Sequence, residues 1–255
     1  MCCLQGRRVT FFESCPSTSV LPLQGTGALL RPTLFVDYRC AVVYNSPMLK
    51  RFSPLILFFC TVLVIAVLAL FGPEEQSLGS NVKIVYLHGA WVLAAELAFA
   101  AAALVGLLAL LLRRDGLYRW SAALGRTGIV FWLTYLPLSL WAMEANWNGL
   151  FLAEPRFRLA LIFAVTGTLL QIGLWLMHVD WLTSLANLIF FIALRVVFSS
   201  ASNVMHPPPS PIFNSGLWNI ILFFIVLNLL AWLAAFFLTK VFLSNMSNKS
   251  DKSEA

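Results

Sequence analysis

The sequence predicts an all-α membrane protein, a polytopic bundle of six transmembrane helices. Of its 255 residues, 60% are hydrophobic and only 11% are Asp, Glu, Lys or Arg, whereas about 25% of the residues in a soluble domain are charged. Its mean hydropathy is +0.84. The 21 Phe and 9 Trp residues exclude a disordered chain, which lacks apolar residues to bury. The apolar runs are continuous and do not alternate, so they indicate helices and not the strands of a membrane β-barrel.

The chain divides into three parts. Residues 1–47 contain four of the five cysteines and no long apolar run, and they lack the pattern of a signal peptide. We expect them to be a disordered or misassigned extension, because Met48 begins a short basic segment directly before an apolar stretch. Residues 48–240 should form the membrane domain. Residues 241–255, rich in Ser, Asn and Lys, are expected to be a disordered cytoplasmic tail.

Six apolar stretches follow Met48, and each is long enough, at about 1.5 Å per residue, to cross a hydrocarbon core roughly 30 Å thick. Pro137 lies inside the third stretch and should kink it, which neighbouring helices tolerate. The expected spans are residues 53–72, 86–112, 122–143, 159–177, 181–199 and 217–239.

The basic residues predict the orientation, because Lys and Arg are enriched in cytoplasmic loops. They lie before the first span, around the loop between the second and third spans, and after the sixth span. Loops 73–85 and 144–158 carry less net positive charge. The bundle should therefore have both termini in the cytoplasm, with loops one, three and five outside. The basic residues in question are Lys50, Arg51, Arg113, Arg114, Arg119, Arg126, Lys240, Lys249 and Lys252.

Two of the three histidines belong to the expected outer face. His88 opens the second span and His206 lies in the fifth loop, while His178 lies in a cytoplasmic turn and is interpreted as a solvated residue. Two neutral imidazoles at one level can ligate a metal. Nearby cysteines or several carboxylates would favour zinc or non-haem iron. Aromatic residues with arginines instead favour haem, with two axial ligands, apolar walls and basic partners for its propionates. Interfacial anchoring is the alternative.

His206 precedes three prolines, which hold the preceding residue and the following segment in extended, stiff conformations. This would fix the direction of the imidazole, as an axial ligand requires. Met205 is adjacent and could ligate through its thioether, although packing is the simpler role.

The third loop is the outer-face aromatic loop. If it is helical, Trp147, Leu150, Phe151 and Glu154 share one face. Such a helix could set Trp147 and Phe151 under a porphyrin and leave Arg156 available to a propionate. Interfacial anchoring by the aromatic residues is the alternative.

Three charged residues lie within the apolar spans, where a charge costs about 2.5–3.5 kcal/mol on insertion scales. Arg126 can extend to the cytoplasmic surface. Arg195, near the outer end of the fifth span, could reach a haem propionate or the lipid headgroups. Glu96 lies eight residues after His88, about 12 Å along a helix, and is too far to ligate the same iron.

Three of these segments resemble the CcmC-like members of the cytochrome c assembly protein family, which handle haem in cytochrome c maturation. They are His88 in Ile-Val-Tyr-Leu-His, the loop from Trp147 to Arg156, and His206 in Asn-Val-Met-His-Pro. The resemblance covers residues 48 to about 240. It implies that His88 and His206 are the axial ligands of haem and that the loop forms the haem platform and partner surface.

The loop follows most of the family segment Trp-Gly-x-x-Trp-x-Trp-Asp-x-Arg without a gap. Trp147 and Arg156 match that segment. Phe151 keeps an aromatic ring and Glu154 keeps the carboxylate, while Ala153 replaces the tryptophan before the acid.

The expected function is therefore an integral membrane protein of cytochrome c biogenesis. It would hold b-type haem non-covalently at the periplasmic face of a bacterial inner membrane and pass it to a haem chaperone or apocytochrome, by ligand exchange and not as an enzyme. The sequence has no Cys-x-x-Cys-His for covalent attachment, and its net charge of +6 marks cytoplasmic loops and not a nucleic-acid partner. One alternative is a small transporter or proton-coupled protein that uses Glu96 and Arg195. Another is a structural subunit without a ligand.

Overall fold

The computed structural model describes residues 53–202 and 212–253, with side chains as far as Met246. Contacts divide the chain into two units, Met1–Asn45 and Ser46–Ala255, and the described residues all belong to the second. The expected N-terminal extension and His206 lie outside the described residues. Every regular element of the described ranges is an α-helix. The helices are α1 Pro54–Leu70, α2 Val82–Leu112, α3 Asp115–Trp147, α4 Pro155–Met177, α5 Asp180–Ser199 and α6 Trp218–Ser253.

Five helices, α2 to α6, are long and apolar enough to cross a membrane. Helix α1 is also apolar but has 17 residues, which rise about 25 Å and fall slightly short of a typical span. The described part of the chain is thus an all-helical, multi-pass membrane protein, as its composition predicts.

The helices extend beyond the apolar stretches from which they were predicted. Helix α3 begins at Asp115 and continues through Pro137 to Trp147. The predicted span was shorter because polar residues at the ends of a helix do not contribute to an apolar run. Helix α6 runs to Ser253, so residues 241–253 are helical where the sequence predicted a disordered tail. No Gly or Pro interrupts residues 217–253, so nothing in that stretch breaks the helix.

The ends of the helices follow local sequence signals. Helices α1 and α4 each begin with Pro at the first helical position, after Ser53 and Glu154 as N-caps, where the missing N–H costs no hydrogen bond. Helices α2 and α4 end at Arg113 and His178, which adopt left-handed conformations. These give tight connections to α3 and α5.

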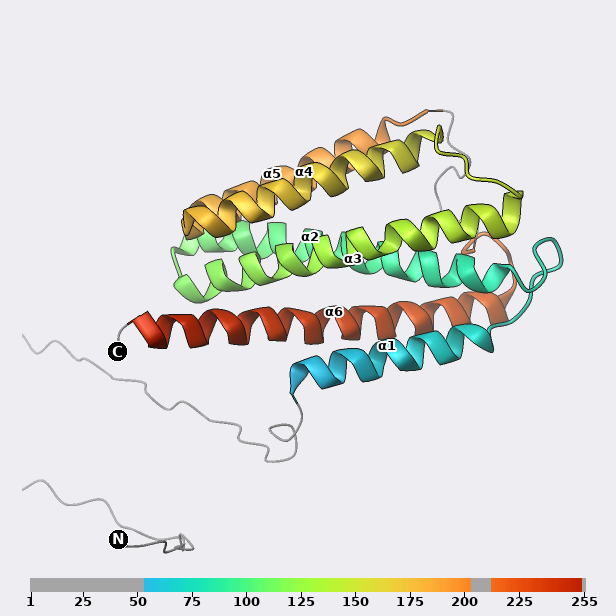
Figure 1. Ribbon diagram of the computed structural model, residues 1–255, viewed down its shortest axis with the longest axis horizontal. Coiled ribbons are helices and arrows are strands. Elements are labelled where there is room, and N and C mark those ends of the chain that lie inside the picture. The colour runs from blue at the N-terminus through green and yellow to red at the C-terminus, as the bar shows by residue number, and fades with distance from the viewer. Residues whose placement is uncertain (1–52, 203–211, 254–255) are drawn as a thin grey trace, which may run out of the picture. The chain divides into compact units, whose positions relative to one another are not determined.

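Successive helices run in opposite directions, so the three longer connections gather at one end of the bundle (Figure 1). Helices α2 and α3 pack against each other. Helices α4 and α5 lie on one side of this pair, while α6 and α1 lie on the other. We call the end at which α1, α3 and α5 finish and α2, α4 and α6 begin the loop end. Which side of a membrane it faces remains a prediction from the charges.

Small residues let the central helices approach closely. A Cβ on Gly128 would lie 2.5 Å from the Phe99 ring, and one on Gly106 would lie 2.9 Å from the carbonyl oxygen of Ser184. Close backbone approach is the usual basis of helix association in lipid, where burial of apolar surface gives no advantage. The face of α2 that is buried against its neighbours is correspondingly rich in alanine: Ala90, Ala94, Ala95, Ala98, Ala102, Ala103 and Ala109.

A buried polar network ties four helices together in the half of the bundle away from the loop end. Asn187 of α5 donates to both the carbonyl and the hydroxyl oxygen of Ser121 in α3, at 2.9 and 3.1 Å. Its amide oxygen accepts from Gln171 of α4 at 2.8 Å, and the Ser121 hydroxyl donates to the carbonyl of Ala102 in α2. The network satisfies polar groups that would otherwise be costly in lipid.

Candidate functional site

The loop end is held together by hydrogen bonds that cross between loops and helices. Asn81, before α2, donates from Nδ2 to the carbonyl oxygen of Ala145 in the last turns of α3, at 2.6 Å. Within the first loop, Glu75 accepts from the backbone of Ser77 and Leu78 and from the Ser77 hydroxyl. The hydrogen bond from Ser77 lowers the pKa of the Glu75 carboxyl.

His88 lies in the second turn of α2, at the loop end, and is half-buried. Its ring centroid is 5.5 Å from that of Tyr135 in α3, with the two rings tilted by 45°. Tyr135 is buried and also packs edge-on against Trp132. Helix α2 thus positions the His88 imidazole against an aromatic wall.

His206 lies outside the described residues, but the residues on either side of residues 203–211 are placed. Ile212, where the chain resumes, lies beside Gly89: its Cδ1 is 4.0 Å from the position of a Cβ on that residue. Ser202, at the other side, lines a groove with Pro155 and Arg158 at the start of α4. The described residues that flank positions 203–211, Ser202 and Ile212, therefore both lie at the loop end, and Ile212 lies beside Gly89, which is the neighbour of His88.

The helix register gives the level at which this segment leaves α5. Gly106 of α2 and Ser184 of α5 are in contact, and the two helices are antiparallel. Counting 15 residues from each toward the loop end brings Ser199, the last residue of α5, opposite Trp91. Trp91 lies three residues from His88, about 4.5 Å along the helix. Counted along the helices, the last turn of α5 therefore comes within about one turn of the level of His88.

The same register explains an ion pair that the sequence did not predict. Glu96 lies ten residues from Gly106, and Arg195 lies eleven residues from Ser184, so the two side chains come level. Arg195 Nη1 is 3.1 Å from Glu96 Oε2. The structure thus gives Arg195 a carboxylate partner in Glu96, and its contact with a propionate or a headgroup stays a prediction. The charge of Arg156, in the first turn of α4, is also near enough to act on Glu96.

The aromatic loop is not the short helix that the spacing suggested. Helix α3 ends at Trp147 because Asn148 adopts a left-handed conformation with φ 49°, and the following residues form turns as far as Pro155. The stripe from Trp147 to Glu154 therefore does not form. Trp147 and Phe151 still pack edge-on with centroids 6.3 Å apart. The loop leaves Leu150, Phe151 and Leu152 exposed.

Glu154 has a structural role at the start of α4. Its carboxylate accepts from the backbone N–H of Phe157 at 2.5 Å, as the N-cap of the helix. Because the cap holds this carboxylate, Glu154 fixes the direction of α4 and thereby the position of Arg156, which is half-buried two residues later.

The structure thus pairs His88 with Tyr135 at the loop end and Glu96 with Arg195 deeper along α2 and α5, while Arg156 and the aromatic loop lie at the start of α4. Tyr135 lies within electrostatic reach of both Glu96 and Glu154. Sequence reasoning missed Tyr135. The available signal was a phenol hydroxyl inside an apolar span, since such a group needs a polar partner.

Within residues 53–202 and 212–253, no three His, Cys, Asp or Glu side chains are arranged to hold a metal ion. His88 beside Tyr135 offers one imidazole and an aromatic wall, and the arginines offer charges suited to carboxylates. Comparisons of this chain with protein families, with characterised proteins and with solved structures found no match.

Proposed function

We propose that this protein binds b-type haem non-covalently at the loop end and passes it to a partner in cytochrome c assembly. The observation that carries the proposal is the placement of His88 and of the described residues that flank residues 203–211. Helix α5 ends at the loop end, and the chain resumes at Ile212, beside Gly89. His206 belongs to the segment between them, and we propose that it meets His88 across the iron. The resemblance of the three segments to CcmC-like proteins supports the same interpretation.

The roles of the chain's own residues follow from their positions. His88 and His206 would each supply an imidazole nitrogen to the iron, which has two axial positions when haem is bound. Tyr135 would keep the His88 ring in place from the buried side. Arg156 and Arg195 would balance the propionates, with Arg195 exchanging or sharing its contact with Glu96.

The exposed aromatic loop is the proposed platform and partner surface. Trp147 and Phe151 form an edge-on pair, while neighbouring leucines are exposed. Exposed aromatic and aliphatic side chains at a membrane surface suit a porphyrin face or a docking protein. We assign the partner as a haem chaperone or apocytochrome. Transfer to such a partner requires ligand exchange at iron and no bond-forming catalysis by the protein.

The distribution of charge supports the orientation. Arg113, Arg114 and Arg119 lie at the end opposite the loop end, together with Lys240. Basic residues mark the cytoplasmic side. We therefore place the loop end on the periplasmic face of a bacterial inner membrane.

The test is the visible spectrum of the full chain purified from a haem-producing host. We expect a bis-histidine b-type spectrum, and we expect His88→Ala and His206→Ala each to lower haem occupancy or alter the Soret band. The control is His178→Asn, which changes the third histidine at the opposite end and retains a residue suited to the left-handed conformation there (φ 55°). Full, unaltered spectra in both alanine variants would refute the ligand assignment.

The Glu96–Arg195 pair favours a second candidate, a small transporter or proton-coupled protein. A charge pair between α2 and α5, with the two side chains 26% and 53% exposed, is the kind of intramembrane feature that marks ion or proton pathways. The test is flux across liposomes that contain haem-free protein. Loss of solute or proton flux in Glu96→Gln would favour this candidate, and an absence of flux in the unaltered protein would exclude it.

A further inference from the structure

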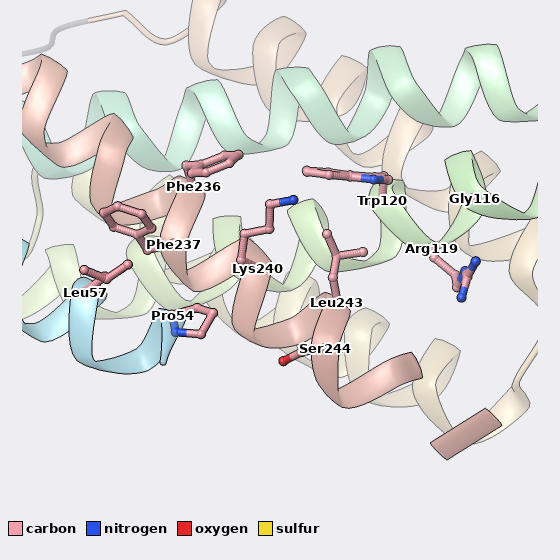
Figure 2. Close-up of a pocket in the computed structure, with 10 residues that line it drawn as sticks. All are labelled: Pro54, Leu57, Gly116, Arg119, Trp120, Phe236, Phe237, Lys240, Leu243 and Ser244. Carbon is pink, nitrogen blue, oxygen red and sulfur yellow. The ribbon is translucent and has the colours of Figure 1, made fainter. Parts of the chain in front are cut away.

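A groove of about 590 Å³ lies at the end opposite the loop end, between the first turns of α1 and α3 and the later turns of α6. Its aliphatic and aromatic side includes Leu57 of α1 and Phe237 of α6 (Figure 2). Its polar side includes Arg119 of α3 and Lys240 of α6. The groove therefore joins an apolar wall to two cations, and it shares no residue with the proposed haem site.

Lys240 is held at this groove by aromatic rings. Its Nζ atom lies 4.8 Å from the centroid of Trp120 and 5.4 Å from that of Phe236, and Figure 2 shows the amine between the two rings. Cation–π contacts orient an ammonium without neutralising it. Among the described residues, neither Lys240 nor Arg119 forms an ion pair with a carboxylate.

Two cations that form no ion pair with a described carboxylate, beside an apolar wall, suit an occupant that has both a negative charge and a hydrocarbon part. A free anion would leave Leu57 and Phe237 uncovered, and an uncharged amphiphile would leave the cations unbalanced. Basic pockets between membrane helices are the usual sites of anionic lipid headgroups. Lys240 follows the apolar length of α6, which places its charge where a headgroup would meet the acyl region.

We propose that this groove is a binding site for an anionic phospholipid. The phosphate lies at Lys240, Arg119 adds positive charge at the other end of the groove, and one acyl chain follows the wall formed by Leu57 and Phe237. Because these residues come from α1, α3 and α6, the lipid bridges the shortest helix to the rest of the bundle. The proposal rests on charge and shape at this end and is independent of haem.

The experiment is native mass spectrometry of the full chain in detergent, titrated with phosphatidylglycerol or with phosphatidylcholine of the same acyl chains. We expect the unaltered protein to bind phosphatidylglycerol at least tenfold more tightly. The double variant Lys240→Ala with Arg119→Ala should lose that tenfold preference, while Lys240→Arg should retain it. The matched control is Arg113→Ala with Arg114→Ala, which removes two exposed arginines from the same end and should leave the preference unchanged.

A second measurement separates lost binding from lost folding. The unfolding temperature of each variant is recorded without lipid and with phosphatidylglycerol, because a ligand that binds only the folded state raises that temperature. The lipid should raise it for the unaltered protein and for the control, but not for the Lys240→Ala with Arg119→Ala variant.

Four results would overturn the proposal. The first is equal affinity for both lipids, and the second is a preference that survives removal of both cations. The third is displacement of phosphatidylglycerol by millimolar inorganic phosphate, which would make the groove a simple anion site. The fourth is a lipid-free dimer, which would assign the groove to a second copy of the chain.

Discussion

Replacing Asn187 with alanine should loosen the packing of α5 against α3 and α4. The side chain is 4% exposed and takes part in three hydrogen bonds between helices: two to Ser121 and one from Gln171. Interhelical hydrogen bonds within membranes contribute about 0.6 kcal/mol each. Their loss therefore lowers the free energy of unfolding by about 2 kcal/mol, which is about 4–8 °C in Tm for a chain of this size.

The chain supplies a matched control in Asn228 of α6. Asn228 is 5% exposed, but its Nδ2 donates only within its own helix, to the carbonyl oxygen of Phe224 at 2.7 Å. Asn228→Ala removes the same atoms from an equally buried position and breaks one intrahelical bond. Asn187→Ala breaks three hydrogen bonds and Asn228→Ala breaks one. At about 0.6 kcal/mol for each bond, the free energy of unfolding should fall by roughly 1.2 kcal/mol more in Asn187→Ala than in Asn228→Ala.

The assay is thermal unfolding of the full chain in one detergent, followed by tryptophan fluorescence. Gln171→Ala adds a double-mutant cycle: the combined variant should be less destabilised than the sum of the two single variants, by about 0.6 kcal/mol, because both single variants break the same bond. Equal Tm losses in Asn187→Ala and Asn228→Ala, or strict additivity with Gln171→Ala, would show that the network does not hold these helices together.

Two further predictions concern close packing and the first loop. Gly167→Ala should lower stability by about 1–3 kcal/mol, because its Cβ would lie 2.6 Å from Ile129 and 2.8 Å from Phe190. Gly173→Ala in the same helix meets nothing within 4 Å and should be neutral or stabilising; the two Tm values check this, and equal values would contradict it. Ser77→Ala should raise the lowered pKa of Glu75 toward 4.5, as carboxyl NMR titration with Ser80→Ala as control would show. Because folding lowers this pKa, the turn contributes stability above pH 4.5 that is lost as the pH falls through the folded-state pKa; an unchanged pKa in Ser77→Ala would contradict the hydrogen bond as its cause.

The membrane class and the helices could be predicted from the sequence because both depend on local composition. Continuous apolar runs locate the part of each helix that crosses a bilayer, and they identified the region of every described helix. They could not give the ends of the helices. Helix α3 begins at Asp115 and ends at Trp147, and its first and last turns contain polar and interfacial residues that lie outside the apolar run. The Ser- and Asn-rich end of α6 is helical although its composition is typical of a tail.

The place of a candidate site residue in the fold could be predicted only where it depended on the position of that residue along its own helix. His88 lies near the start of a long apolar stretch and is indeed near the end of a helix. The aromatic stripe failed because its periodicity assumed a helix, whereas Asn148 leaves the helical conformation. The Glu96–Arg195 pair could not be foreseen, because it depends on the register of α2 against α5. That register is fixed by the close approach of Gly106 to Ser184, a contact between residues far apart in the sequence.

The two ends of the bundle differ in how they are held, and the difference bears on the proposed binding and transfer of haem. Away from the loop end, Asn187 and Gly106 fix the helices through buried hydrogen bonds and backbone contact. At the loop end, the contacts include an exposed hydrogen bond from Asn81, the cap formed by Glu154 and the Lys83–Glu74 ion pair, whose carboxylate is exposed. Such contacts break locally at less cost than a buried network. Under the proposed function, these contacts would open around His88 for ligand exchange, while the buried network keeps the helices in register.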